Sequence, residues 1–167
     1  RIDASRARAM TGVACVLTGA DVKAQCEPFM QLGPEPANKI IDLPLATDKT
    51  LYQGHPVAAV AATSAALAMD AGLMIEVDYD MLDAVVDPEQ ALADGVVLHE
   101  AAGTNRTWHG VWDCGNVDQA FADAAHVVKI DRLHFHRFSS TPLEASACVA
   151  EWNRRGELDL LCNNSFI

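Results

Sequence analysis

Apolar residues in the first third of the chain gather in short runs that end at glycine or at hydroxyl residues. The run at 13–17 ends at Thr18-Gly19 and is typical of a buried strand. The run at 57–62 contains no polar residue, so it predicts a strand that is buried on both faces. Between them, residues 27–44 are interrupted by proline and glycine, which predicts a long loop.

A strand–helix–strand order follows. Thr63 or Ser64 can cap a helix, because a hydroxyl oxygen accepts from the free amides of the first turn. Four apolar residues of this helix recur at helical spacing: Leu67, Ala71, Met74 and Ile75. Residues 76–80 are extended again. The order predicts a crossover unit whose two strands run parallel or lie next to each other.

The second half carries further start and stop signals. Asp87-Pro88 begins a helix and Gly95 ends it, and Asn116 caps another helix with an apolar face. Strands are expected at 96–98, at 127–137 with alternating side chains, and in a hairpin of 147–152 with 158–161. Glycine, asparagine and tryptophan at 101–116 predict the crossing between two subdomains.

Composition limits the protein classes. Half of the 167 residues are hydrophobic but only 6% are aromatic, so the core must consist mainly of alanine, valine, leucine and isoleucine. A net charge of -11 repels phosphate groups, which argues against nucleic acid and anionic membranes as partners. No apolar run is long enough for a membrane span, and no signal peptide is visible, which favours the cytoplasm. The five cysteines lack a CxxC spacing and are expected to be buried free thiols.

Few residues suggest chemistry by spacing alone. His126, His134 and His136 share one face of the expected strand and could bind zinc, but strand histidines at this spacing more often face solvent or a neighbouring strand, so we assign no metal site. No nucleophile elbow or phosphate-binding glycine motif occurs. Glu144 is a candidate because it precedes a strand that should be buried; the alternative is a structural role with a backbone partner.

Several segments, in order, resemble one family. They are TGVACVLTGADV (11–22), GHPVAAVAA (54–62), EVDYD (76–80) with DAVVDP (83–88), LHE (98–100), GNVDQAF (115–121) and TPLE (141–144). Each motif alone has low specificity. The ordered set is similar to the large subunits of molybdenum hydroxylases, the group of xanthine dehydrogenase, aldehyde oxidase and aerobic carbon monoxide dehydrogenase. The similarity covers nearly the whole chain.

The resemblance implies an α/β (α+β) fold, with an α/β hammerhead domain at 1–112 and the first strands of a truncated molybdopterin-binding domain at 113–167. It also implies an enzyme that hydroxylates an aldehyde or N-heterocycle, or oxidises CO, with water as the oxygen source. Molybdopterin-bound molybdenum performs this chemistry, and electrons leave through 2Fe-2S and FAD on partner domains or subunits.

The resemblance assigns few site residues here. The family's catalytic glutamate and main cofactor loops lie beyond Ile167, so we expect no catalytic residue and no cofactor bound by residues 1–167 alone. Asn164 stands where the family has a glutamine near the molybdenum, and its shorter amide makes direct contact doubtful. Glu144 matches the family's PLE glutamate, for which we expect a supporting role in the cofactor domain.

Two interpretations of the chain remain. The first is an N-terminal piece of a molybdenum hydroxylase large subunit, whose partners are the rest of that subunit and the iron–sulfur and flavin subunits, in an oligomer. The alternative is a free-standing acidic α/β interaction or assembly module without enzymatic activity. Under the first interpretation, a sheet that ends inside the domain leaves unpaired strand edges, so we expect the isolated chain to self-associate or to contact neighbours through residues 158–167.

Overall fold

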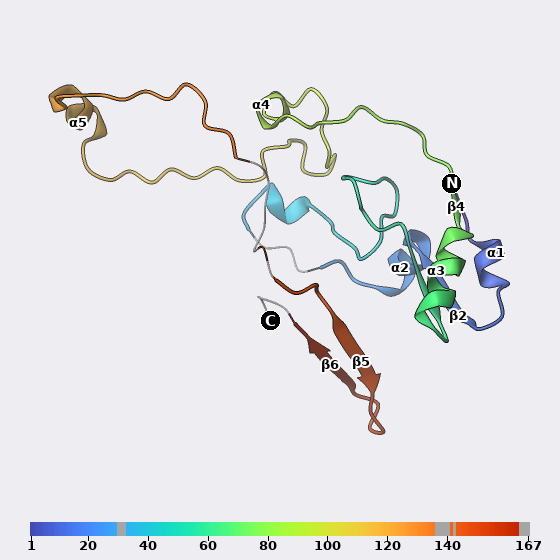
Figure 1. Cartoon of the computed structure of the whole chain (residues 1–167). Helices are drawn as coiled ribbons and strands as arrows, with labels where there is room; N and C mark the ends of the chain where they lie inside the picture. The colour runs from blue at the N-terminus through green and yellow to red at the C-terminus, as the bar shows by residue number, and fades with distance from the viewer. Residues whose placement is uncertain (30–32, 136–140, 142, 164–167) are drawn as a thin grey trace. The chain divides into compact units, whose positions relative to one another are not determined.

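A computed structural model describes residues 1–29, 33–135, 141 and 143–163. The chain divides into two compact units, Arg1–Asp113 and Cys114–Ile167, which are considered separately below. Figure 1 follows the elements from β1 to β6. In the described part of the chain, no helix is long and apolar enough to cross a membrane.

The first unit contains two small antiparallel sheets. Strand β2 (Val13–Thr18) pairs with β3 (Ala58–Ala62), and strand β1 (Ile2–Asp3) pairs with β4 (Glu76–Val77). The predicted crossover unit is therefore wrong. The strands before and after the helix do not pair with each other, because each pairs with an earlier strand of opposite direction. Strand β3 is also not buried on both faces, because its residues alternate between partly buried and exposed.

The helices of this unit begin where polar side chains satisfy free backbone amides. Helix α3 (Ala65–Leu73) begins at Ser64, whose hydroxyl accepts from the amide of Leu67 at 3.2 Å. Helix α4 (Pro88–Ala91) begins at Asp87, whose carboxylate accepts from the next two free amides. Three further helical segments are α1 (Ser5–Arg8), α2 (Gly19–Gln25) and the 3-10 helix η1 (Ala37–Lys39).

The core of the first unit is built from alanine, valine and leucine without a buried aromatic residue among the described residues, as the composition predicted. Its buried cluster consists of Ala4, Ala7, Val16 and Ala71. Val22, Leu45 and Ala46 are buried as well. The first residue of helix α2 approaches the backbone of Ala46 so closely that a Cβ on Gly19 would lie 2.0 Å from the Ala46 carbonyl oxygen. The packing of α2 therefore requires glycine at its first residue.

A side-chain network replaces the strand expected at 96–98. The Asn105 side chain accepts from the amide of Leu98 at 2.9 Å and donates to the carbonyls of Val96 and Ala91 at 2.7 and 3.1 Å. These bonds occupy backbone groups that a strand would use, so the prediction of a strand here is wrong. The carboxylate of Asp94 accepts in turn from the backbone amide of Asn105 at 2.7 Å.

The described residues of the second unit form one helix and one hairpin. Helix α5 (Val117–Asp123) begins at Asn116, whose side chain accepts from the amide of Gln119 at 3.0 Å, as predicted. Strands β5 (Cys148–Trp152) and β6 (Leu158–Cys162) form the expected antiparallel hairpin.

Two further predictions from the sequence are wrong: the strand at 127–137 and the burial of the cysteines. Residues 127–135, the described part of the strand predicted at 127–137, form no strand, because alternation alone does not supply a partner. All five cysteines are free but exposed rather than buried. The two in the first unit, Cys15 and Cys26, lie outside its small-residue core.

Candidate functional site

The open end of the β5–β6 hairpin is closed by one side chain. The Asn163 amide oxygen accepts from the backbone nitrogen of Ala147 at 2.6 Å, and its Nδ2 donates to the carbonyl of Ala145 at 3.0 Å. The backbone nitrogen of Asn163 also donates to the carbonyl of Ala147 at 3.3 Å. We call these three bonds the Asn163 clasp. It prolongs the strand pairing beyond β5 and β6 with side-chain atoms.

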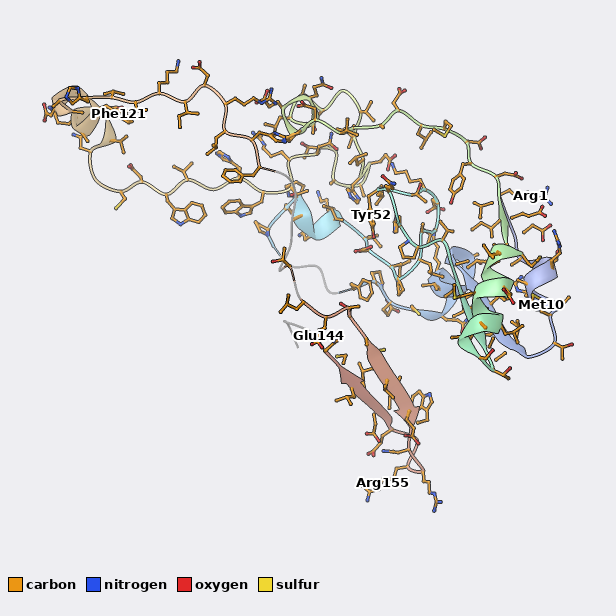
Figure 2. The ribbon with its side chains drawn as sticks, in the orientation of Figure 1. Arg1, Met10, Tyr52, Phe121, Glu144 and Arg155 are labelled. Atoms are coloured by element: carbon orange, nitrogen blue, oxygen red, sulfur yellow. The ribbon has the colours of Figure 1, made fainter. Side chains whose placement is uncertain are left out.

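The two positions that the resemblance singled out are sequence neighbours of residues in the clasp. Glu144 immediately precedes Ala145, and Asn164 immediately follows Asn163. Figure 2 shows Glu144 at the open end of the hairpin and Arg155 at the turn. The Glu144 side chain is exposed in the second unit. Asn164 itself lies outside the described residues.

Sequence reasoning missed Asn163, although a signal was present. Asparagine directly after the last apolar residue of a strand often bonds to nearby backbone, because its short amide both donates and accepts. The other end of the hairpin follows the same principle. The side-chain amide oxygen of Asn153 accepts from the backbone nitrogens of Arg155 and Glu157 at 2.9 and 3.0 Å, which fixes the turn. Both ends of the hairpin are thus positioned by asparagine side chains.

The histidines of the second unit do not form a recognisable metal centre in the described residues. His126 is exposed and lines a shallow apolar surface that combines helix α5 with the segment after it: Val117, Ala120, Phe121, Ala124, Val127 and Val128. His134 is described, whereas His136 lies outside the described residues. No group of three histidine, cysteine, aspartate or glutamate side chains within the described ranges could hold a metal ion.

The carboxylates of the first unit that have shifted pKa values serve the fold. The pKa of Asp94 is lowered because its carboxylate accepts from the backbone of Asn105 and from the Thr104 hydroxyl. The pKa of Glu100 is lowered chiefly by its hydrogen bond from Lys49. Such groups stay ionised at neutral pH and cannot donate a proton there. The described geometry is therefore that of a framework, with one hydrogen-bonded hairpin end that can present side chains.

Comparison with known proteins identifies this framework. Residues 1–83 match the "Aldehyde oxidase and xanthine dehydrogenase, a/b hammerhead domain", and residues 98–167 match the "Molybdopterin cofactor-binding domain". The carbon monoxide dehydrogenase large chain of Afipia carboxidovorans is 37% identical over 95% of this chain and 21% of that protein. The nicotine 6-hydroxylase large subunit of Paenarthrobacter nicotinovorans is 33% identical over 90% of this chain and 18% of that protein.

Solved structures agree with the sequence comparisons. Reconstituted CO dehydrogenase from Oligotropha carboxidovorans matches with a TM-score of 0.73 and 31% identity, over 96% of this chain and 21% of that one. The chain spans about a fifth of the length of these relatives. Its fold is an α/β hammerhead domain with the start of a molybdopterin-binding domain. The chain therefore belongs to the aldehyde oxidase and xanthine dehydrogenase family of molybdenum hydroxylase large subunits.

Proposed function

We propose that residues 1–167 are the framework at the start of a molybdopterin-dependent oxidoreductase large subunit. The complete enzyme hydroxylates an aldehyde or an N-heterocycle, or oxidises CO, and takes the oxygen atom from water. Residues 1–167 contribute no catalytic group. The observation that carries the proposal is the consecutive match to the two domain families, in the order hammerhead and then cofactor domain.

The relatives support the reaction class but differ in substrate. One is named for carbon monoxide and the other for hydroxylation of nicotine, an N-heterocycle. Both are 33–37% identical to this chain, so identity does not favour either substrate. We therefore propose the class of reaction, an oxidative hydroxylation or CO oxidation, without choosing the substrate. When bound, molybdopterin supplies the metal at which the oxygen is transferred.

The described residues alone do not fit molybdopterin. A phosphate-bearing pterin needs converging N–H donors and positive charge. At the open end of the hairpin, the Asn163 side-chain amide already bonds to the backbone in the clasp. Glu144 adds a carboxylate, which is negatively charged and only accepts hydrogen bonds. Arg154 and Arg155 lie in the turn at the opposite end. The cofactor contacts must come mainly from other parts of the complete protein.

Within this limit, we propose supporting roles for two residues. Glu144 supports the cofactor domain from the open end of the hairpin, and Asn164 presents its amide toward the cofactor. The Asn163 clasp supports the assignment of Glu144, because it holds the backbone of Ala145, the next residue along the chain. We also place the domain boundary at 112/113, beside the division between the compact units after Asp113.

The proposal includes partners and a cellular location. Electrons leave through 2Fe-2S and FAD groups on partner domains or subunits, and the large subunit assembles with them into an oligomer. One relative is named as subunit gamma of a dehydrogenase complex, which supports a multi-subunit assembly. The five free cysteines suit the cytoplasm, which is a reducing compartment.

The test uses the complete protein that contains residues 1–167. It is purified with its partner subunits, its molybdenum content is measured, and it is supplied with CO, an aldehyde or an N-heterocycle in ¹⁸O-labelled water with an artificial electron acceptor. We expect bound molybdenum and turnover of at least one substrate, followed as reduction of the acceptor. Residues 1–167 alone should show neither. The ¹⁸O label is informative for the N-heterocycle, because CO2 and aldehydes exchange oxygen with water unaided. Oxygen derived from O2 would contradict the proposed reaction, and absence of both molybdenum and turnover in the complete protein would favour the assembly-module alternative.

A further inference from the structure

Two free cysteines face each other across the hairpin. Cys148 is the first residue of β5 and Cys162 the last residue of β6, and the two are direct partners in the register. Both thiols are free and exposed in the second unit. The pair is absent from the sequence-based expectations, because 13 residues separate the two cysteines and no short motif links them.

The hydrogen bonds at both ends of the hairpin show whether Cys148 and Cys162 form a hydrogen-bonded or a non-hydrogen-bonded antiparallel pair. Antiparallel partners alternate between hydrogen-bonded and non-hydrogen-bonded positions. Asn163 donates to the carbonyl of Ala147, and Asn153 donates to the carbonyl of Glu157, so the hydrogen-bonded positions on the first strand include 147 and 153. Position 148 is therefore a non-hydrogen-bonded position, at which the side chains of the two strands lie closest.

Non-hydrogen-bonded geometry suits a disulfide. The Cα atoms of such partners lie roughly 4.5 Å apart, inside the range of about 4.4–6.8 Å that a disulfide spans. Directly opposite residues also project from the same face of the hairpin. The Asn163 clasp holds the register one residue beyond the pair. The register therefore already holds the two cysteines in the arrangement from which a disulfide can form.

We propose that Cys148 and Cys162 form a dithiol site that a small-molecule disulfide oxidises to an intramolecular bond. The thiolate of one cysteine attacks the small disulfide, which forms a mixed disulfide and releases one thiolate. The other cysteine attacks the protein sulfur of the mixed disulfide, forms the Cys148–Cys162 bond and releases the second thiolate. Each protein thiol loses one proton, and the small disulfide is reduced to two thiols. This inference is independent of the proposed catalytic function.

The test treats the 167-residue chain with oxidised glutathione and maps the linked peptides by mass spectrometry. We expect one bond between Cys148 and Cys162 within a single chain. C148S and C162S should each abolish it. The matched control C114S removes another exposed cysteine of the same unit and should leave the bond unchanged. Bonds that join other cysteines, or that join two chains, in place of this bond would overturn the proposal.

A second variant tests whether the hairpin register is the cause. In L161C/C162S the thiol moves by one residue, to the position that pairs with Val149 on the opposite face. We expect the equilibrium constant for bond formation with Cys148 to fall by at least about tenfold. Oxidation of the wild-type chain should fall similarly in urea. Equal oxidation of the shifted variant, or of the chain in urea, would show that chain flexibility forms the bond, which contradicts the proposal.

Discussion

The Asn163 side chain lies 2.6 Å from the backbone nitrogen of Ala147 and, with its second bond to the carbonyl of Ala145, serves as an additional pairing unit of the β5–β6 hairpin. Two strands alone are marginally stable in water. A side chain that satisfies backbone groups at their open end therefore contributes a substantial part of the local stability. The same bonds determine where Glu144 stands relative to the end of β6.

Replacement of Asn163 by alanine should open this end of the hairpin. Two side-chain bonds are lost, and a net loss of about 1 kcal/mol in local stability is expected. The Ala147 amide should lose protection from hydrogen exchange, because its acceptor is the Asn163 side chain. Arg154→Ala, at the opposite end, is the control and should leave this protection unchanged. Unchanged protection in Asn163→Ala would mean that the clasp does not hold the open end.

Gly19→Ala should destabilise the first unit. The added methyl carbon would lie 2.0 Å from the backbone oxygen of Ala46, which cannot move aside as a flexible side chain would. The expected loss is about 1–3 kcal/mol in the free energy of unfolding, measured by urea denaturation.

Gly72→Ala provides the matched control. Gly72 lies inside helix α3, where an added Cβ meets nothing within 4 Å. This variant should gain about 0.5–1 kcal/mol, because alanine is the better helix former. If both variants changed stability in the same direction, the close approach at Gly19 would not be the cause.

Asn105→Ala should release the segment that follows helix α4. The Asn105 side chain makes three hydrogen bonds to backbone groups between Ala91 and Leu98, and no other side chain reaches those groups in the described residues. We expect a loss of about 2 kcal/mol and faster proteolytic cleavage near 91–98. Asn38→Ala, in η1, is the control. Equal cleavage rates in wild type and Asn105→Ala would contradict the anchoring role.

Asp21 should make the first unit sensitive to acid. Its pKa is lowered because its carboxylate accepts from the backbone amide and the hydroxyl of Thr18, with Arg8 nearby. The unfolded chain binds this proton more readily than the folded chain. The contribution of Asp21 is therefore complete above the unfolded pKa and is lost as pH falls through the folded pKa, in a window below about pH 4.

The measurement is urea unfolding between about pH 3 and pH 6. Wild type should lose stability toward the acid end, and Asp21→Asn should lose less. Thr18→Val removes only the hydroxyl donor and should fall between them, because the backbone bond to Asp21 remains possible. The same pH dependence in wild type and Asp21→Asn would show that the capping carboxylate is not responsible.

Local signals in the sequence predicted local structure well. Asn116, Ser64 and Asp87 cap helices where they were expected, because a cap depends only on residues within one turn. The hairpin of β5 and β6 was predicted for the same reason, since its turn and both strands are adjacent in the chain. The composition also predicted an aliphatic rather than aromatic core, which Ala7 and Val16 confirm.

Partners distant in sequence could not be predicted in this way. Strand β4 pairs with β1 across more than 70 residues, and no local pattern encodes that choice. Residues 127–135 alternate like a strand but form none, because a strand also needs a partner. At the candidate site, the resemblance indicated Glu144, whereas the role of Asn163 depends on hydrogen bonds that only the folded hairpin creates. The Cys148–Cys162 pair likewise requires the observed register.

The fully buried Ala7 and Ala71 belong to the cluster in which helices α1 and α3 meet. The methyl groups of these two alanines lie where the two helices are in contact, so neither position can accept a larger residue unless a neighbour becomes smaller. Glycine at one position and valine at the other would add only one carbon to the two present now, whereas two valines would add four and force the helices apart. Among relatives, the sizes of these two residues should consequently covary, and that correlation would trace the helix contact through evolution.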